Sequence, residues 1–400
     1  MSNVPPGIVC TAEEYALSLS TDDNPYPTIT CLTHGQNIGV LLTVEAALIS
    51  LCSIAFLFTL IIRNVYRHWT QVPWNKWRLL QEPMDIFMMS LFCSDFLQAF
   101  GMVMNIKWVH EAKLYSGDYC TAQGAIQQLG ETGVAMATFV ISVHTFIAVM
   151  WRKGTHSRLA AFCIVGFIWL FVALFVGLGV GLHRSPGDLY DVPTPFWCWV
   201  GGRFLAERIA GEYFWLWLAL STSLLVYVPL YFWSQGRLSV DPHKWWRFRM
   251  HRPMVVEDTD GRKRRAMAML AYPLIYAILV LPLTVVRWIN FGLEAHGTDA
   301  PSVFNFVVIV VFSLSGAANV TLLLTTRPQL LLFSKPNVVV VAEGRAPSPS
   351  PIRRGSSKPS LGDASSQEPM QLGRLNDDMG WNLPSGRMSV ASSYMSTDMP

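Results

Sequence analysis

The stretch that decides the fold runs from Cys120 to Trp151 and reads CTAQGAIQQLGETGVAMATFVISVHTFIAVMW. As a helix rising about 1.5 Å per residue, it is long enough to span a bilayer. Gln123, Gln127 and Glu131 recur at four-residue steps on one helix face, and such side chains are costly against lipid. Small residues keep the helix thin and admit close neighbours: Gly124, Gly130, Gly133, Ala135 and Ala137. The stretch therefore predicts a helix in the middle of a membrane bundle.

The composition is that of a membrane protein. The chain has 400 residues, of which 52% are hydrophobic and 14% charged, and its mean hydropathy is +0.33. Soluble domains carry roughly 25% charged residues. The low charged fraction therefore indicates a membrane protein.

Seven apolar spans are expected, each with the ~20 apolar residues that a bilayer requires. They cover residues 38–62, 83–106, 120–150, 160–182, 211–234, 266–291 and 302–325. We find no internal repeat, which argues against a transporter built on duplicated halves. The predicted fold class is an all-α membrane protein with a seven-transmembrane helix bundle.

The charges of the connecting loops predict the orientation. Residues 1–37 contain no Lys or Arg, and the loop after the sixth span contains Glu294 and Asp299 without a basic residue. Basic residues instead follow the first, third and fifth spans, most densely between Arg237 and Arg265; the loop at 183–210 is a mild exception. The positive-inside rule then places the N-terminus outside and the C-terminus in the cytoplasm.

The cysteines fall into different compartments of this topology. Cys120 and Cys198 lie on the predicted outer side, where a bridge would close a loop of about 80 residues and contribute roughly 4–5 kcal/mol. Cys10 and Cys31 are compatible with a bridge or with two free thiols. The remaining cysteines lie inside spans and are expected to be inert packing residues: Cys52, Cys93 and Cys163.

The two ends of the chain are expected to be simple. Residues 1–37 form a short extracellular tail without a signal peptide, too short for a large ligand-binding domain. The membrane-spanning domain covers 38–333, including a short juxtamembrane helix after Pro328. Residues 334–400 are rich in Ser and Pro and are expected to be a disordered cytoplasmic tail. Four serines there precede prolines or follow arginines and are candidate phosphorylation sites: Ser348, Ser350, Ser356 and Ser357.

Tryptophans alternate with basic residues in the predicted inner loops, for example Trp245 and Trp246 beside Lys244 and Arg247. Beside membrane spans this pattern favours lipid headgroups over nucleic acid. The lipid bilayer is therefore an expected partner and nucleic acid is not.

Several motifs stand out along the spans. They are CTAQG at Cys120 with the Gln, Gly and Glu that follow, HTF at His144, Cys198-Trp199, GEYFWLWLAL from Gly211, MLAYPLIYAILVLPLTVVRW from Met269 and SGAANV from Ser315. Together they resemble the cAMP-receptor-like family of G-protein-coupled receptors of slime moulds and fungi. The resemblance covers about residues 38 to 333. It implies a plasma-membrane receptor that activates a heterotrimeric G protein feeding cAMP signalling, with a ligand that the family name does not identify.

The chain departs from two other receptor classes. Ala148-Val149-Met150 stands where rhodopsin-like receptors have Asp-Arg-Tyr, and the last span has no lysine to form a retinal Schiff base. The alternative function is a transporter or channel in which Asp95, Glu131 and Arg287 form a polar path; flux without G-protein dependence would favour it. An enzyme is not expected, because His144 has no partner at metal-ligand spacing, and neither a cofactor nor a metal is expected.

The predicted ligand pocket lies between the outer ends of spans three, five, six and seven, beneath the loop that holds Cys198. It combines convergent polar groups with aromatic walls, as small-molecule sites do. Arg287 is expected to pair with Glu131 or Glu212 until an anionic ligand group replaces that partner, or else to extend to the outer headgroups. The candidate residues are Gln123, Gln127, Glu131, Trp199, Glu212, Tyr213, Arg287, Trp288, Asn290 and Asn305.

Two further groups of residues complete the expected receptor. Asp95 near the middle of span two, Asn319 in span seven and His144 in span three are candidates for a network that distinguishes resting from active states. The basic residues on the inner side are candidates for G-protein coupling: Arg152, Lys153, Arg262, Lys263, Arg264 and Arg265.

Overall fold

The computed structural model describes residues 5, 7–19, 28–69, 80, 82–150, 157–185, 188–235, 237–240, 248–250, 262–294 and 301–326. All of these belong to one compact unit, Met1–Val339. The predicted juxtamembrane helix after Pro328 and the predicted disordered tail lie outside the described residues.

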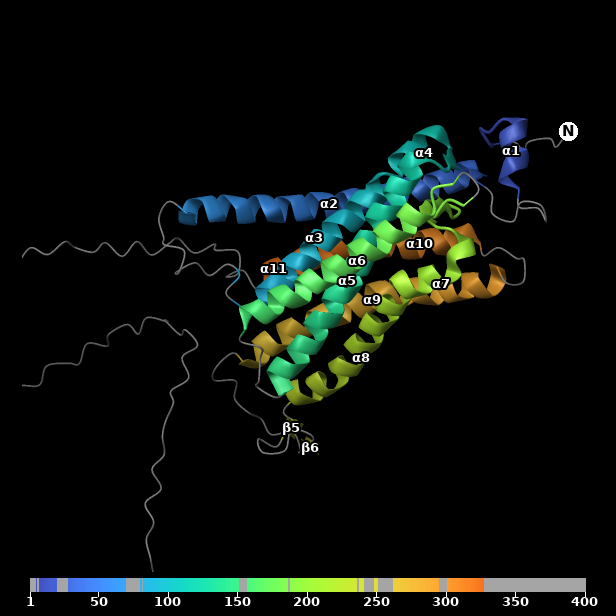
Figure 1. Cartoon of the computed structure of the whole chain (residues 1–400). Helices are drawn as coiled ribbons and strands as arrows, with labels where there is room; N and C mark the ends of the chain where they lie inside the picture. The colour runs from blue at the N-terminus through green and yellow to red at the C-terminus, as the bar shows by residue number, and fades with distance from the viewer. Residues whose placement is uncertain are drawn as a thin grey trace, which may run out of the picture. The chain divides into compact units, whose positions relative to one another are not determined.

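Long apolar helices make up this unit (Figure 1). They are α2 (His34–Trp69), α3 (Pro83–Val103), α5 (Asp118–Met150), α6 (Arg158–Leu182), α8 (Phe214–Ser234), α9 (Arg262–Glu294), α10 (Ser302–Ser313) and α11 (Ser315–Thr326). Among the described residues, six segments are long and apolar enough to cross a membrane, and Leu274–Asn290 within α9 is a shorter apolar helix. The prediction of a helical membrane bundle is confirmed to this extent, while the sidedness of its ends stays a prediction.

The helix α5 lies in the middle of the bundle, as its sequence predicts. It packs against α3, α6, α8 and α9. The approach to α3 is closest at Gly130 and Gly133, where an added methyl group would overlap Gln98 or Ser94. By contrast, α6 is the least buried of the six apolar segments, as expected for its uncharged sequence.

The N-terminal segment is folded rather than a loose tail. Its helix α1 (Ala12–Ser18) begins with a capping box between Thr11 and Glu14. The strand β1 (Ile29–Cys31) then pairs antiparallel with β2 (Lys113–Tyr115), which follows the short helix α4 (Ile106–Glu111). A Cys10–Cys31 disulfide bridge closes this segment. The choice that the sequence leaves open is thus resolved in favour of the bridge.

A second small sheet covers the head of α5. The strands β3 (Asp191–Pro193) and β4 (Cys198–Val200) form a hairpin, and Cys198 is bonded to Cys120 in the first turn of α5. This confirms the predicted Cys120–Cys198 bridge. We refer to the end of the bundle that carries both bridges as the disulfide end. A third two-stranded sheet joins β5 (Leu238–Val240) and β6 (Phe248–Met250).

One predicted span is interrupted, and another is preceded by irregular helical turns. Between α10 and α11, the Ser50 hydroxyl of α2 donates to the Ser313 carbonyl at 2.6 Å and accepts from the Ala317 N–H at 3.2 Å. A side chain inserted in this way breaks the helical hydrogen-bond ladder. Before α8, the chain passes through a 3₁₀ turn (Gly202–Phe204), α7 (Leu205–Arg208) and a π-helical turn η3 (Ile209–Tyr213). The Thr132 hydroxyl donates to the Gly211 carbonyl in that turn at 2.9 Å.

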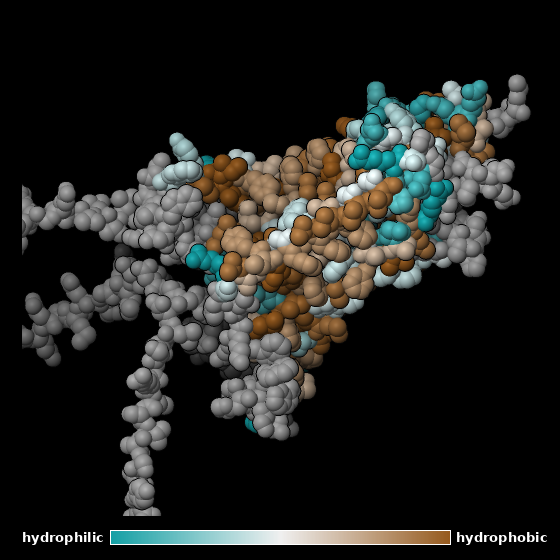
Figure 2. Space-filling model, in the orientation of Figure 1, coloured by the Kyte–Doolittle hydropathy of each residue, from teal (hydrophilic) through white to brown (hydrophobic). Residues whose placement is uncertain are grey.

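The surface agrees with a membrane protein. In Figure 2, apolar residues cover much of the side of the bundle, and hydrophilic residues gather toward the end where α1 and α4 lie in Figure 1. Cys52, Cys93 and Cys163 are exposed on this apolar surface. The expectation that they pack inside is therefore wrong, because their positions on α2, α3 and α6 turn them outward.

Candidate functional site

The polar row of α5 separates into two environments at the disulfide end. Gln123 is fully buried and faces the junction of α3 and α4. It accepts from Trp108 Nε1 and donates to Asn105 Oδ1, both at 2.6 Å, and its amide nitrogen also lies 3.4 Å from the Gly101 carbonyl. Its hydrogen-bonding groups are therefore occupied within the fold. This geometry favours a role in holding the α3–α4 bend over the predicted contact with a ligand.

The lower part of the row forms a buried polar cluster with η3. Gln127 donates to Glu131 Oε1 at 3.0 Å, and its own carbonyl oxygen makes no hydrogen bond within the described residues. The carboxyl groups of Glu131 and Glu212 face each other and are 5% and 3% exposed. Two carboxyl groups buried together require a nearby cation or hydrogen-bond donors.

Arg287 of α9 is the cation whose charge acts on both Glu131 and Glu212. Among the described residues no ion pair within 4.0 Å joins it to either carboxyl group, so the predicted direct pairing is not formed in this structure. The guanidinium carbon also lies 4.8 Å from the ring centre of Trp197, in the turn of the hairpin. A cation over an indole face is an attractive contact. Arg287 thus joins α9 to the hairpin above the buried carboxyl groups.

Asn290 and Asn305 join two further helices at this end. The Asn290 side-chain amide donates to Asn305 Oδ1 at 2.7 Å, which links α9 to α10. Asn305 is 9% exposed, and the Asn290 carbonyl oxygen makes no hydrogen bond within the described part of the chain. The structure therefore brings these two predicted residues together.

The aromatic residues of the predicted pocket lie in different places. Trp199 is a buried residue of the hairpin strand β4, and Tyr213 in η3 is buried and stacks on Trp217. Trp288, however, is 55% exposed on the surface of the bundle. Its ring stacks against Trp217, with ring centres 4.6 Å apart. The expectation that Trp288 forms an inner wall is corrected, because its place on α9 directs it to the perimeter.

Two buried residues at this end are absent from the predicted pocket. Asp191 in β3 and Gln128 in α5 are each 1% exposed. Burial raises the pKa of the Asp191 carboxyl group to about 8. Gln128 lies one turn after Gly124 on the same face of α5, and this spacing could have predicted from the sequence that the two residues face the same neighbour. Asp191 offers no such signal, because it lies in a loop without periodicity.

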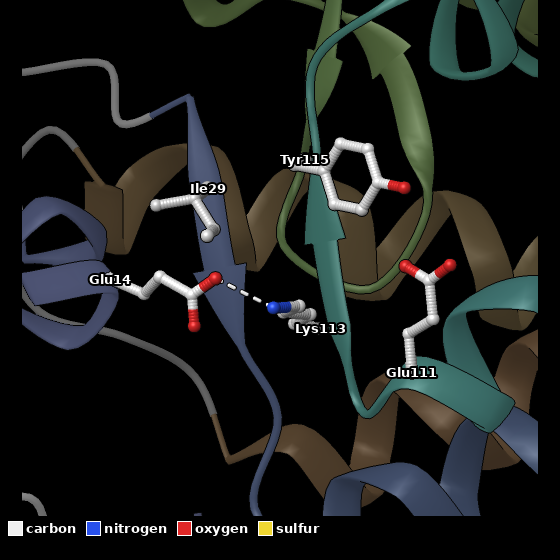
Figure 3. A pocket seen from close by; sticks show the side chains of 5 residues that line it. All are labelled: Glu14, Ile29, Glu111, Lys113 and Tyr115. Atoms are coloured by element: carbon white, nitrogen blue, oxygen red, sulfur yellow. Dashed lines mark hydrogen bonds and ion pairs between the residues drawn. The ribbon is translucent and has the colours of Figure 1, made fainter. Parts of the chain in front are cut away.

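A shallow cavity of about 560 Å³ lies at the N-terminal segment, lined by Glu14, Ile29, Glu111, Lys113 and Tyr115. Figure 3 shows the Lys113 ammonium turned toward Glu14, at 2.6 Å, and away from Glu111. The hydrogen bond from Lys113 lowers the pKa of Glu14. Exposed ion pairs of this kind add little stability, so its role is to position the segment against β2.

The predicted switch residues lie deeper in the bundle. The Asn319 amide of α11 donates to Asp95 Oδ2 of α3 at 2.8 Å. His144 of α5 packs edge-on against Phe87 of α3, with ring centres 5.5 Å apart. Asp95 and Asn319 are therefore partners, while His144 belongs to a separate contact between α5 and α3. Whether these contacts change between two states stays a prediction.

Other predicted residues cannot be placed. Arg152, Lys153 and the serines at 348, 350, 356 and 357 lie outside the described residues. For Arg262–Arg265 the structure describes the helical backbone at the start of α9 and no side chains. Within the described ranges, no cluster of three or more His, Cys, Asp or Glu side chains could hold a metal ion.

Comparison with known protein families finds no family model that matches this chain. Comparison with curated proteins finds no significant match either.

Proposed function

We propose that this protein is a plasma-membrane G-protein-coupled receptor that senses a small extracellular ligand and feeds cAMP signalling through a heterotrimeric G protein. The proposal rests on the apolar helical bundle and on the motifs that resemble cAMP-receptor-like proteins. A single structural observation carries it furthest: a hairpin bonded to the head of the central helix covers a buried cluster of polar and aromatic side chains.

The disulfide end suits the ligand-binding side. Disulfide bridges form in oxidising compartments, and both bridges lie at the end that the positive-inside rule places outside. The hairpin is held over α5, while Gln127, Glu131, Glu212 and Arg287 lie beneath or beside it. A buried site with aromatic walls and a few polar groups is typical of small-molecule recognition.

The deeper contacts suit transmission through the bundle. The Asp95–Asn319 hydrogen bond joins α3 to α11 just below the break between α10 and α11. Buried polar groups at membrane depth are costly, and a pair of them can have two discrete arrangements. We propose that ligand binding at the disulfide end changes the packing of α9–α11 and hence this pair.

Coupling is tested on the opposite end of the bundle. We expect that neutralising Arg152, Lys153 and the four bases Arg262–Arg265, each to Gln, lowers nucleotide exchange on the partner G protein several-fold. The physical reason is that a G protein docks on the basic inner surface through complementary charge. Exchange is measured in membranes from cells that display equal amounts of receptor on their surface.

The matched control removes positive charge from the disulfide end. Arg203→Gln and Lys113→Gln neutralise exposed bases that pair with Asp188 and Glu14, and exchange is expected to stay at the parent level. Equal exchange by the inner-loop variants and the parent would refute the coupling proposal. Solute flux that needs no G protein would instead support the transporter alternative.

The ligand site is tested once a cAMP screen of nutrients, lipids, peptides and nucleotides has found an agonist. Arg287→Ala and Gln127→Ala are each expected to shift agonist potency at least tenfold at unchanged surface level. Each substitution removes a side chain near the Glu131–Glu212 cluster. A hydrogen bond to a charged group contributes roughly the free energy of a tenfold change in affinity or more. Arg203→Ala is the control arginine, half-exposed and paired with Asp188. Parent-like responses from both variants would place the ligand elsewhere.

A further inference from the structure

An unpaired carboxyl group lies beneath the hairpin. The Asp191 side chain is 1% exposed, and neither carboxyl oxygen makes a hydrogen bond within the described residues. Burying a carboxyl group without a partner costs several kcal/mol, so proteins keep such groups rarely and mostly at functional sites. The Glu131–Glu212 cluster does not use Asp191, and the unpaired burial of this carboxyl group therefore needs a separate explanation.

The backbone around Asp191 makes room for its carboxyl group. The Cys120–Cys198 bridge and the Asp191–Val200 pairing hold β3 against the head of α5. On α5 the facing residue is Gly124, and a Cβ atom there would lie 2.5 Å from Asp191 Oδ1. Only glycine at this position allows the carboxyl group to reach the helix surface.

Further unpaired polar atoms converge on the same face of α5. Both amide atoms of Gln128 and the hydroxyl of Tyr190 are buried, and neither group makes a well-formed hydrogen bond within the described ranges. The Tyr190 hydroxyl faces the Gln128 amide. A Cβ atom on Gly211 would lie 2.9 Å from Gln128 Nε2, so η3 closes the other side, and Glu212 Oε2 is also unpaired.

The chemistry of this group favours a cationic hydrogen-bond donor. Its atoms are mostly acceptors: two oxygens of Asp191, one of Gln128 and one of Glu212. The nearest described arginines are engaged elsewhere, since Arg208 donates to the Val200 carbonyl and Arg287 lies over Trp197. A metal ion does not fit, because no metal-binding cluster exists among the described residues. A protonated amine brings one charge and several N–H donors.

We propose that Asp191, with Gln128 and Tyr190, is the subsite that binds a protonated amine group of the receptor's small ligand. This inference rests on the proposed function and adds the ligand class. Together with Arg287, which is expected to take an anionic group, it makes a ligand with an amine at one end the preferred class.

The test uses the purified full chain and its thermal unfolding. The probes are matched pairs with one carbon skeleton: hexylammonium against 1-hexanol, and 2-phenylethylammonium against 2-phenylethanol. At ten times its dissociation constant, an ammonium probe is expected to raise Tm by about 3 °C and the alcohol by less. Asp191→Asn is expected to abolish this difference, and Asp188→Asn, at an exposed carboxylate paired with His183 and Arg203, to keep it.

The pH dependence provides a second readout. Burial raises the Asp191 pKa from 3.8 to about 8, so the unliganded group is mostly neutral at pH 6 and must ionise to pair with an amine. Amine affinity is therefore expected to rise about fifty-fold between pH 6 and 8, most steeply below pH 7, and to be flat in Asp191→Asn. The charged or titratable groups on the elements packed against β3 are Asp118, Tyr119, Glu131 and His144 of α5 and Lys113 and Tyr115 of β2. The flanking segments add His183, Arg203, Glu207, Arg208 and Glu212.

Thermal unfolding without ligand shows whether the Asp191→Asn variant folds. Because the folded pKa lies above the unfolded value, the parent loses stability relative to the variant as pH rises from about 4 to about 8, and the difference is constant above that. The variant is thus expected to match the parent at pH 4 and to melt at a higher temperature at pH 8.

Three outcomes would overturn the proposal. They are alcohols that stabilise as well as amines, an amine effect that persists in Asp191→Asn, and no stabilisation by any amine. A response of G-protein exchange to pH alone, without amine binding, would make Asp191 a proton sensor instead. The thermal readout needs no G protein, so this inference can fail while the coupling test succeeds, and the reverse.

Discussion

Cys198→Ser is expected to remove most of the folded protein from the cell surface. The Cys120–Cys198 bridge spans a sequence separation of 78 residues. Closing such a loop contributes roughly 4–5 kcal/mol, which is a large part of the 5–15 kcal/mol that stabilises a typical domain. Both cysteines are completely buried, so the serine hydroxyl would also lack solvent. Surface labelling and the Tm of detergent-purified protein measure the loss.

The control is a cysteine of the same chain that makes no bridge. Cys163 is exposed on α6, and Cys163→Ser is expected to leave surface level and Tm close to the parent. Peptide mapping without reduction should recover both linked pairs from the parent, Cys120–Cys198 and Cys10–Cys31. Free thiols at positions 120 and 198, or a Cys198→Ser variant as stable as Cys163→Ser, would contradict the assigned role of the hairpin.

Gly130→Ala is expected to destabilise the bundle by about 1–3 kcal/mol or more, as overpacking of a close-packed interface does. A Cβ atom at Gly130 would overlap the backbone nitrogen of Gln98 and lie 2.6 Å from its Cα atom. Because the obstacle is the backbone of α3, no side-chain rotation relieves it. The two helices would have to separate at the centre of the bundle, and a lower Tm would report this.

The same substitution on the bundle surface is the control. An added Cβ atom at Gly166 of α6 meets nothing within 4 Å. Alanine there is expected to keep or raise Tm, since alanine is favoured over glycine in helices by up to about 1 kcal/mol. If Gly130→Ala melted at the same temperature as Gly166→Ala, the close contact between α3 and α5 would be wrong.

Local sequence patterns account for the helices, because the backbone of an apolar span in a bilayer must satisfy its own hydrogen bonds. They also account for the central position of α5, since a thin polar helix cannot face lipid. The Cys120–Cys198 bridge follows from the predicted compartments of the two cysteines. In each case the physical cause acts on residues close together in the chain or through the surrounding solvent. The relevant pattern can therefore be recognised in the sequence alone.

The partners of the α5 polar row were decided by the tertiary structure. A four-residue step turns a helix by about 40° beyond a full turn, so a row of such steps winds slowly around the axis. Gln123 consequently faces α4 and bonds to Trp108, whereas Glu131 reaches Glu212 on η3. Sequence spacing predicts one face, but only the neighbouring helices determine what each side chain meets.

The same limit applies to Trp288 and to the three unbridged cysteines, whose direction depends on how each helix is rotated in the bundle. It applies most strongly to Asp191, a loop carboxylate that becomes buried because a disulfide and a glycine bring its strand against α5. The sequence by itself determined that this chain is a bundle of apolar helices with a polar central helix and an anchored loop. Only the tertiary structure decided which polar groups are left unpaired beneath that loop, because burial and hydrogen bonding depend on contacts between segments distant in sequence.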